Sequence, residues 1–384
     1  SLLPLNGNAR LNQKSHPSAL SSTVNVVSSS ISSSTLLIRT INDETAAVDE
    51  QERKDQDGGV APDDGMTPEM ITEGKRKEML NIDKHRVYDI VPTPSGVKPI
   101  HTRWVLRRKG GGVKARLVVK DINKYATADF YAPTPSLSSL RLVLSHNSWS
   151  RRCHRKSNFC VRVADVSTAF LNADVVGDVY IYPPSDLELA SGHCWKLRKA
   201  LYGLRQAPQL WSLHLADLLQ KGGFSRSRAE PSVFFRGTGE DMVMILVHVD
   251  DLVFSGAEHH VQSVIDHLSS SLQLTVGDSL LRTGDRCSML GRTIERREEG
   301  YVLTGDESLF RLSLKELNME DAKPVSTPII SSSANEAESP ALSPQLHKPY
   351  RSHVGRLAYI ASDRLDIQYC TKTLALLGQG FFVA

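Results

Sequence analysis

Two apolar runs that flank a pair of aspartates are the most informative pattern of hydrophobic and polar positions in the chain. The segment MVMILVHVDDLVFSG (242–256) predicts a buried β-hairpin with Asp250 and Asp251 at its turn. An earlier segment, VRVADVSTAFL (161–171), alternates as a strand does up to Asp165 and then becomes helical. Strands that end side by side would bring Asp165 close to Asp250.

Periodic segments on both sides of this pattern predict further helices and hairpins. TRWVLRRK (102–109) and VKARLVV (113–119) are expected to pair as strands across a loop of three glycines, residues 110–112. Another hairpin is predicted within residues 288–305. The remaining predicted elements are helices at 68–84, 136–147, 211–224 and 259–272, and a strand, DVYIYPP (178–184), that ends at two prolines.

Two segments have compositions that disfavour a folded core. Residues 15–35 contain ten serines, and Asp, Glu, Gly and Gln dominate residues 42–66, so too little apolar surface is present to offset chain entropy. We therefore expect residues 1–66 to be a disordered, Ser-rich and acidic segment, and residues 331–345, rich in Ser, Pro and Ala, to form a linker. No basic leader or cleavage site accompanies the apolar residues 36–38, so secretion is not expected.

The cysteines and the apolar runs argue against two classes of protein. The five cysteines form no CxxC pair, which disfavours a disulfide scaffold and fits a reducing compartment better. No apolar run reaches the roughly 18 residues of a membrane-spanning helix. We therefore expect no membrane partner.

Charge is distributed unevenly along a chain that is almost neutral as a whole. The 384 residues carry 46 Lys and Arg against 43 Asp and Glu, which taken alone argues against a nucleic-acid partner. Residues 101–160, however, hold 13 Lys and Arg and only 2 Asp and Glu, so this segment has a local charge of +11. Such a basic segment favours contact with phosphate.

A carboxylate pair at a tight turn between apolar strands needs a compensating cation, because like charges repel strongly beside a low-dielectric core. A divalent metal is the simplest compensation, and Mg²⁺ sites typically combine one or two protein carboxylates with substrate phosphates. With Asp165 added, the three carboxylates are the donor set that two-metal phosphoryl or nucleotidyl transfer requires. The alternative is that Asp250 and Asp251 form an ordinary solvated turn, since Asp-Asp dipeptides are common.

Several motifs, found in one order along residues 70–375, carry a resemblance to a known family. They are KARLVV (114–119), YAP (131–133), DVSTAFLNA (165–173), VYIYPP (179–184), KLRKALYGLRQAPQLW (196–211), HVDDLVFSG (248–256), MLGRTI (289–294), AKPVSTP (322–328) and YRSHVGRLAYI (350–360). KALYGLRQAP is the most specific of them, followed by DVSTAFL. In these motifs the chain resembles the reverse transcriptase domain of copia-type (Ty/copia) long-terminal-repeat retrotransposon Pol polyproteins.

The resemblance implies an α+β fold of the right-hand polymerase type, in which the palm carries an antiparallel sheet. It places the fingers at residues 67–148, the palm with the catalytic carboxylates at 149–285, and a thumb-like, primer-grip region at 286–330. Residues 346–384 would be a truncated connection toward a ribonuclease H domain, whose acidic cluster is not found in the sequence. We therefore expect the chain to be one segment of a polyprotein.

The resemblance also assigns roles to individual residues. Asp165, Asp250 and Asp251 would be the catalytic carboxylates, with Asp165 and Asp250 as direct ligands of two Mg²⁺ ions, or of Mn²⁺ in their place. Phe170 would lie under the incoming sugar and exclude a 2′-hydroxyl by its shape, and Gln206 would contact the incoming nucleotide and the template. The other expected contacts are Lys109, Lys114 and Arg116 with the triphosphate, His248 with the primer end, and Met289, Leu290 and Gly291 in the primer grip.

The assignments outside the carboxylates have structural alternatives. Phe170 could be a core aromatic, Gln206 could cap the helix that begins near Pro208, and the three basic residues could form a solvated strand face. Two departures from the family pattern bear on activity. His248 stands where the family usually has tyrosine, and the connection NSWSRRCHRKSNFC (147–160) is longer and more basic than its counterpart.

The leading hypothesis is RNA-directed DNA polymerase activity, a nucleotidyl transfer that extends a primer 3′-hydroxyl with deoxynucleotides. Its partners would be an RNA and DNA primer-template, deoxynucleoside triphosphates, and the integrase and ribonuclease H segments of the parent polyprotein. One alternative is a catalytically degenerate retrotransposon relic that binds nucleic acid without polymerising. Another, a metal-dependent phosphohydrolase, lacks an evident water-activating base. We expect a cytoplasmic location in virus-like particles, a nuclear location, or both.

Overall fold

The computed structural model describes residues 65–122, 130–154, 158–187, 189–305, 307–323 and 342–379, with the side chains of the last range described to residue 376. The predicted disordered segment 1–66 lies outside the described residues except for Gly65 and Met66, as does the predicted linker up to residue 341. Within these ranges, no helix combines the length and the apolar character that crossing a membrane requires.

The described chain contains both helices and antiparallel sheets, which confirms the expected α+β class. The helices are α2 (Pro68–Lys84), α3 (Leu137–Cys153), α4 (Ala207–Lys221), α5 (Glu258–Ser269), α6 (Glu307–Glu316), α7 (Pro344–Ala361) and α8 (Leu365–Gln379), with 3₁₀ turns η1 (Ala169–Asn172) and η2 (Gly239–Asp241). The strands are β1 (Tyr88–Pro92), β2 (Thr102–Lys109), β3 (Gly112–Val119), β4 (Phe159–Val166), β5 (Tyr180–Ile181), β6 (His193–Leu197), β7 (Ser225–Arg226), β8 (Val233–Arg236), β9 (Val243–His248), β10 (Asp251–Ala257), β11 (Leu274–Val276), β12 (Arg286–Met289), β13 (Arg292–Arg296) and β14 (Tyr301–Gly305). They form a six-stranded sheet in the order β11-β4-β10-β9-β8-β7, two three-stranded sheets, β1-β6-β5 and β12-β13-β14, and the hairpin β2-β3.

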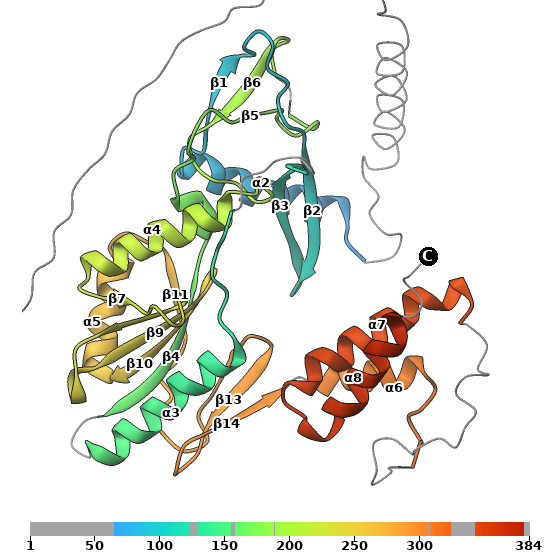
Figure 1. Ribbon diagram of the computed structural model, residues 1–384. Coiled ribbons are helices and arrows are strands. Elements are labelled where there is room, and N and C mark those ends of the chain that lie inside the picture. Colours follow the sequence, from blue (N-terminus) through green and yellow to red (C-terminus); the bar gives the residue numbers. More distant parts are fainter. Residues whose placement is uncertain are drawn as a thin grey trace, which may run out of the picture. The chain divides into compact units, whose positions relative to one another are not determined.

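The six-stranded sheet is covered on both faces, which explains why its central strands are continuous apolar runs in the sequence. In β9, Val243 and Ile245 pack in one hydrophobic cluster with side chains from α4 and α5. The alternate residues, Met244 and Leu246, pack in a second cluster with side chains from α3, β12 and β13. Figure 1 shows α4 and α5 on one side of this sheet, and α3 with β13 and β14 on the other.

A buried polar side chain fixes α3 against the sheet. The fully buried Asn147 donates from Nδ2 to the carbonyl oxygen of Cys160 (2.8 Å) and to Oγ of Ser255 (3.1 Å), and its Oδ1 accepts a hydrogen bond from the Tyr301 hydroxyl (2.8 Å). Burial raises the pKa of Tyr301 to about 12, so this hydroxyl remains a donor at physiological pH. Because an unpaired buried amide is unfavourable, Asn147 determines how α3 sits on β4 and β10.

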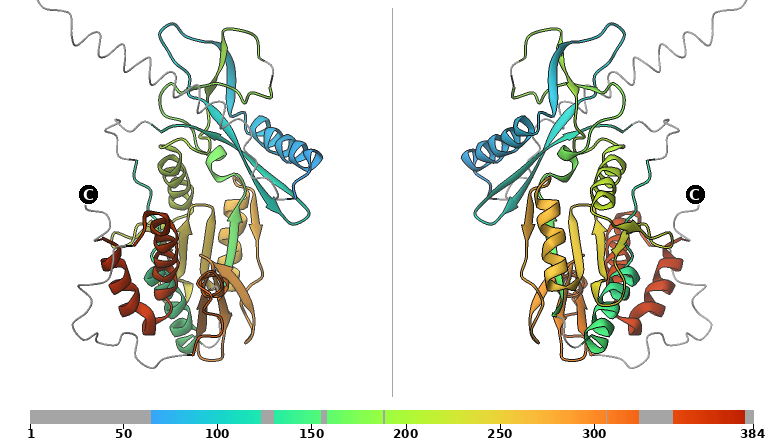
Figure 2. Two further views of the ribbon diagram at one scale, coloured as in Figure 1. Left: turned by 90° about the vertical axis from the view of Figure 1, so that its right-hand side faces the viewer. Right: turned by 90° about the vertical axis from the view of Figure 1, so that its left-hand side faces the viewer.

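The basic hairpin predicted within residues 102–119 is confirmed. β2 and β3 pair along their whole length around the turn Gly110–Gly111. Helix α2 packs along this hairpin, as both views in Figure 2 show. A Cβ atom at Gly74 of α2 would lie only 2.6 Å from the carbonyl oxygen of Val113, so the glycine permits the close approach of helix and strand.

The loop between β6 and α4 is attached to the end of the same hairpin. The N–H of Val119 donates to the carbonyl oxygen of Tyr202 (2.8 Å), and the N–H of Arg205 donates to Oδ2 of Asp121 (3.1 Å). Gly203 has a φ of +87°, and a Cβ atom there would lie 2.2 Å from the carbonyl oxygen of Val119. The β2-β3 hairpin is therefore joined directly to the segment that leads into α4.

The C-terminal helices contact the turn of the β12-β13 hairpin. This turn is Leu290–Gly291, with both residues at positive φ, as in the type I′ turns that suit two-residue hairpins. The side chain of Arg292 is only 6% exposed and forms an ion pair with Asp363 (Nε to Oδ2, 2.9 Å). Arg292 Nη1 and the Tyr359 hydroxyl both donate to the carbonyl oxygen of Leu290 (2.8 and 2.9 Å). The end of α7 and the loop that follows it thus hold this turn in place.

Two predicted elements differ from the structure in length. The helix predicted at 136–147 continues to Cys153, across the boundary at residue 148 between the predicted fingers and palm, because Ser148 and Ser150 are still buried against the sheet. The strand predicted at 178–184 is reduced to β5, since two prolines follow it and lack the N–H that a ladder requires.

We predict that Gly203→Ala lowers the free energy of unfolding by about 3 kcal/mol, because the added Cβ meets the β3 backbone and the positive φ disfavours any side chain. Gly96→Ala is the matched control. Gly96 also has a positive φ (+76°), but beyond its chain neighbours no atom of the described residues lies within 4 Å of the position of its Cβ, so about 1 kcal/mol is expected. Urea denaturation measures both, and equal losses would contradict the close approach.

Candidate active site

The pairing of β4 with β10 brings the predicted carboxylates together. Asp165 stands directly opposite Asp251 in the register of the two strands. Residues that oppose each other on antiparallel strands project to the same face, with Cβ atoms about 4.5–5.5 Å apart. Asp250 is the second residue of the two-residue turn between His248 and Asp251. The three carboxylates therefore lie at one end of the central hairpin, as the strand pattern predicted.

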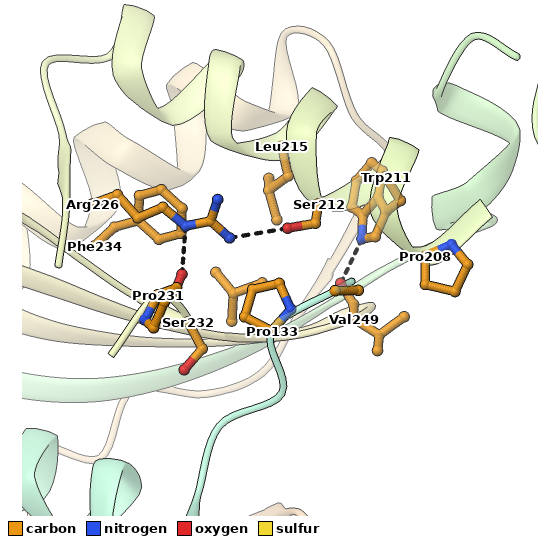
Figure 3. Close-up of a pocket in the computed structure, with 12 residues that line it drawn as sticks. Pro133, Pro208, Trp211, Ser212, Leu215, Arg226, Pro231, Ser232, Phe234 and Val249 are labelled. Carbon is orange, nitrogen blue, oxygen red and sulfur yellow. Dashed lines mark hydrogen bonds between the residues drawn. The ribbon is translucent and has the colours of Figure 1, made fainter. Parts of the chain in front are cut away.

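Hydrogen bonds to both of its carbonyl groups hold the turn that carries Asp250. Trp211 Nε1 donates to the carbonyl oxygen of Val249 (2.6 Å; Figure 3), and the N–H of Val166 donates to the carbonyl oxygen of Asp250 (2.7 Å). Val249 has a φ of +55°, a left-handed conformation that a β-branched residue rarely adopts. Backbone strain of this kind persists only where the surrounding structure fixes it.

A cavity of about 20 Å³ lies beside the contact between Trp211 and Val249. Most of its walls are apolar, and Arg226 closes one side by donating to the carbonyl oxygen of Pro231 and to Oγ of Ser212 (3.0 Å; Figure 3). A volume of this size holds about one water molecule. The cavity is therefore part of the support behind the turn and too small for a nucleotide.

Asp165 has the clearest electrostatic signature of the three carboxylates. Burial raises its pKa, and the negative charges of Asp250 and Asp251 raise it further. The positive charges of Lys114 and Lys109 act in the opposite direction. The three carboxylates are thus close enough to repel one another, and the basic hairpin partly offsets this repulsion.

The basic hairpin and the carboxylates act on each other across the site. Burial lowers the pKa of Lys114, as do the charges of Arg116 and Lys109, whereas Asp165 and Asp250 raise it. Lys109 and Lys114 are exposed at the hairpin surface, while Arg116 is half-buried with its guanidinium 4.8 Å from the centre of the Tyr202 ring. The alternative of a purely solvated strand face is therefore wrong for Arg116, and the hairpin places positive charge near the carboxylates.

Phe170 lies at the edge of the core. It is half-buried in η1 and packs against the larger hydrophobic cluster, with its ring edge-to-face against Tyr202 (centroids 5.1 Å apart, 70°). Thr168, just before η1, has a φ of +52°, and its Oγ1 lies 3.1 Å from Nε2 of His85. Phe170 is therefore both a packing residue and a partly exposed aromatic surface, and these two interpretations do not exclude each other.

Gln206 occupies the N-cap position of α4, but its side chain makes no capping hydrogen bond. Pro208 stands in the first turn of the helix and lacks the N–H that a cap would satisfy. The helix-cap alternative is therefore wrong for the side chain of Gln206. Its amide is half-buried, and a role in contacting a nucleotide stays a prediction.

His248 lies beside the carboxylates. It opposes Asp251 across the hairpin, and its Nδ1 is 3.8 Å from Oδ2 of Asp251. This distance is longer than a hydrogen bond, and among the described residues the buried Nδ1 has no hydrogen-bond partner. The Nδ1 atom therefore faces Asp251 without a hydrogen bond to it.

The three residues predicted for the primer grip differ in their exposure. Met289 is only 2% exposed and packs in the second hydrophobic cluster, so it supports the hairpin from within. Leu290 and Gly291 form the turn and reach the surface. Tyr359 lies against this turn, since a Cβ atom on Gly291 would be 2.5 Å from its hydroxyl oxygen.

The donor chemistry of the site fits a divalent cation. Asp165, Asp250 and Asp251 offer carboxylate oxygens, the hard ligands that Mg²⁺ prefers, and a bound cation would relieve the repulsion that raises the pKa of Asp165. In the described ranges, no group of three or more His, Cys, Asp and Glu residues already has the arrangement of a metal site. The three carboxylates therefore have the chemistry, but not a preassembled arrangement, for holding a divalent cation.

Sequence reasoning did not identify two residues that support the site. Trp211 was only the first residue of the helix predicted at 211–224, and Tyr202 was part of a motif without a role of its own. Both contacts arise from the tertiary fold: Trp211 reaches Val249, and Tyr202 lies between Phe170 and Arg116. The polar atom of each ring was the available signal, because buried tryptophan and tyrosine usually find a hydrogen-bond partner.

The family described as "Reverse transcriptase (RNA-dependent DNA polymerase)" matches residues 85–331. The chain is 28% identical over 324 residues to the "Retrovirus-related Pol polyprotein from transposon TNT 1-94" of Nicotiana tabacum, covering 79% of this chain and 24% of that protein. It is 32% identical over 313 residues to the "Retrovirus-related Pol polyprotein from transposon RE1" of Arabidopsis thaliana, covering 76% of this chain and 20% of that protein.

A third relative is shorter. The "Putative transposon Ty5-1 protein YCL074W" of Saccharomyces cerevisiae is 30% identical over 215 residues, covering 55% of this chain and 68% of that protein. The chain thus spans about a quarter or less of the two plant Pol polyproteins. The family match covers well over half of the chain and includes the strands, the turn and the helix that build the site. The chain belongs to the reverse transcriptase family and carries a copia-type reverse transcriptase domain.

Proposed function

We propose that the chain is the polymerase segment of a copia-type Pol polyprotein and catalyses RNA-directed DNA synthesis. The observation that carries this proposal is the carboxylate cluster: Asp165 opposes Asp251 across two paired strands, and Asp250 occupies the adjoining turn. The charges of Lys114 and Lys109 act on this cluster from the β2-β3 hairpin. A site with carboxylates on one side and cations on the other suits a metal-bound triphosphate.

In this proposal the described elements follow the right-hand plan. The six-stranded sheet is the palm, the β2-β3 hairpin and α2 belong to the fingers, and β12-β14 with the C-terminal helices form the thumb-like part. The attachment of the β6-α4 loop to β3 through Val119, Tyr202 and Gly203 supports this plan, because it fixes the fingers hairpin to the helix that borders the palm.

The proposed reaction is a nucleotidyl transfer. The 3′-oxygen of the primer attacks the α-phosphorus of a deoxynucleoside triphosphate, a new oxygen–phosphorus bond forms, and the bond to the β-phosphate bridge breaks to release pyrophosphate. The hydroxyl proton passes to solvent. Two Mg²⁺ ions, when bound, would lower the pKa of the attacking hydroxyl and neutralise the leaving pyrophosphate. Asp165 and Asp250 would hold them, with Asp251 as the third carboxylate.

The remaining site residues would bind and orient the substrates. Lys109, Lys114 and Arg116 would bind the triphosphate, and Gln206 would contact the base-paired nucleotide. Phe170 would occupy the space beside C2′ of the sugar, so that a 2′-hydroxyl meets its ring. Its edge-to-face contact with Tyr202 supports this role, because a ring that selects by shape has to be held rigidly.

The substrates and partners follow from the same proposal. An RNA or DNA template annealed to a primer would lie across the basic segment 101–160, whose charge is +11, and the other segments of the polyprotein would act with this one. Two plant relatives are Pol polyproteins of which the chain covers only a part, which supports further segments in the parent protein.

A second candidate is a domain that binds primer-template without extending it. His248, where the family usually has tyrosine, favours this possibility, since it lies 3.8 Å from Asp251 and thus changes the chemistry directly beside the carboxylates. Binding that weakens with salt, together with no extension by the wild-type protein, would support this candidate and contradict the polymerase.

We predict that Asp250→Asn lowers primer extension by at least about 100-fold, because an amide cannot replace a charged metal ligand. The measurement is extension of a labelled DNA primer on an RNA template with Mg²⁺ and four deoxynucleotides. Asp241→Asn is the matched control, since Asp241 is an exposed carboxylate paired with His260 and should leave extension unchanged. Wild-type activity in the Asp250→Asn variant would contradict catalysis at this site.

Removing one carboxylate should also stabilise the metal-free protein. Because the pKa of Asp165 is raised in the fold, its charge destabilises the folded state at neutral pH, and this penalty disappears as the pH falls toward the ordinary value of 3.8. Asp165→Asn should therefore raise the melting temperature by about 2 °C at pH 7 in EDTA, and the difference should vanish near pH 4. A lower melting temperature at pH 7 would contradict the proposed repulsion.

We predict that Phe170→Ala weakens the preference for deoxynucleotides over ribonucleotides by at least about tenfold, since the ring would no longer meet the 2′-hydroxyl. The ratio of kcat/KM for dGTP and GTP measures this preference. Phe235→Ala on β8 provides the control, because Phe235 is a partly exposed aromatic residue on a strand that does not carry the carboxylates. An unchanged ratio in Phe170→Ala would argue that Phe170 has only a packing role.

A further inference from the structure

The conformation of the Val249–Asp250 turn requires support from outside the hairpin. Val249 is the first of two residues between His248 and Asp251 and is left-handed (φ +55°), whereas Asp250 is not among the residues with positive φ. In two-residue hairpin turns of this kind the first position is usually glycine. A β-branched residue there is strained, so an isolated hairpin would relax and carry Asp250 with it.

Two hydrogen bonds oppose this relaxation, and they come from different elements. The N–H of Val166, next to Asp165 in β4, donates to the carbonyl oxygen of Asp250 (2.7 Å). The indole N–H of Trp211, in α4, donates to the carbonyl oxygen of Val249 (2.6 Å). The first bond belongs to the sheet itself, whereas the second is the side-chain contact that reaches the strained residue.

The burial and the orientation of Trp211 both favour this contact. The residue is 1% exposed, and Figure 3 shows its ring at the start of α4 with the ring nitrogen directed at Val249. The indole N–H is a donor only, and leaving it unpaired in the core would be unfavourable. The Val249 carbonyl is therefore the acceptor that this tryptophan requires, and the position of the ring in α4 sets the position of the turn.

We propose that Trp211 is a positioning residue that holds the Val249–Asp250 turn in the conformation needed for metal binding. Gln206 occupies the N-cap of the same helix, so α4 would fix the relative positions of the nucleotide-contacting amide and the turn. The catalytic consequence rests on the proposed polymerase function. The structural consequence, that the Trp211 indole holds the turn, is independent of that function.

The test is Trp211→Phe, which keeps an aromatic ring in the core and removes the donor. Val166 reports on the turn directly, because its N–H is bonded to Asp250. We expect its amide hydrogen exchange to accelerate about tenfold, the Kd for Mn²⁺ measured by electron paramagnetic resonance to rise about tenfold, and kcat for primer extension to fall by a similar factor. The KM for deoxynucleotide should stay within twofold of wild type.

Trp195→Phe is the matched control. Trp195 is 2% exposed and stacks on Tyr88 (centroids 3.7 Å apart) in the β1-β6-β5 sheet, so this variant disturbs the same hydrophobic cluster without touching the turn. It should leave the exchange of Val166 and Mn²⁺ binding unchanged. Equal acceleration in both variants would show that Trp211 acts only through general packing, and would overturn the proposal.

A double variant separates positioning from packing. Glycine adopts the left-handed conformation without strain, so in a Val249→Gly background the turn needs less support, and Trp211→Phe should accelerate Val166 exchange by less than twofold. A full tenfold effect in that background would also overturn the proposal. Absence of extension by the wild-type protein would contradict the polymerase function, whatever the exchange measurements show.

Discussion

The repulsion among Asp165, Asp250 and Asp251 is the constraint on which the rest of the site depends. The register of β4 and β10 forces two of these carboxylates into opposition, and the sheet that does so is covered on both faces, so the strands cannot slide apart without exposing apolar side chains. Hydrophobic burial thereby maintains an electrostatically unfavourable arrangement. The surrounding elements either offset the charge, as Lys114 and Lys109 do, or fix the backbone that carries it.

Backbone strain is found in three of the segments that carry residues predicted for the site. Among the described residues, Thr168 precedes η1, Val249 lies in the carboxylate turn and Leu290 in the β12-β13 turn, and all three are left-handed without being glycine. Each has a partner from another element that holds it: His85, Trp211 and Tyr359, respectively. The fold supplies these partners at positions distant in sequence, so the site exists only when the whole domain is assembled.

The pattern of apolar residues was sufficient to predict the β2-β3 hairpin, the central hairpin and the meeting of Asp165 with the aspartate pair. These features follow from local periodicity and from the rule that opposed residues share a face. The sequence did not predict that Val249 is left-handed, since valine is atypical there. It also did not predict that Met289 is buried, because the second hydrophobic cluster brings together side chains from distant elements, among them α3, β9, β10 and β13. Motif matching placed Met289 in the primer grip, but only the packing shows which side of the hairpin it occupies.

The contacts of Gln206 and Trp211 show the same difference between what the sequence predicts and what the tertiary fold determines. Both residues stand in one motif at the start of α4, and the sequence predicts a helix that begins at Trp211. The acceptor of the Trp211 indole N–H depends on how α4 lies on the sheet. The sequence of α4 alone does not determine that position, so the contact with Val249 could not be predicted. The sequence likewise left open whether the side chain of Gln206 caps α4, and the structure shows no capping hydrogen bond from it.

The ion pair between Arg292 and Asp363 has a consequence for the order of folding. The β12-β13 hairpin can form from residues that are neighbours in sequence, but the guanidinium that lies beneath its turn finds its carboxylate 71 positions later, after α7. A growing chain therefore passes through a stage in which Arg292 has no countercharge and favours water over the interior. The charge beneath the turn is therefore compensated only once the segment that carries Asp363 is present, which ties the hairpin to the C-terminal helices.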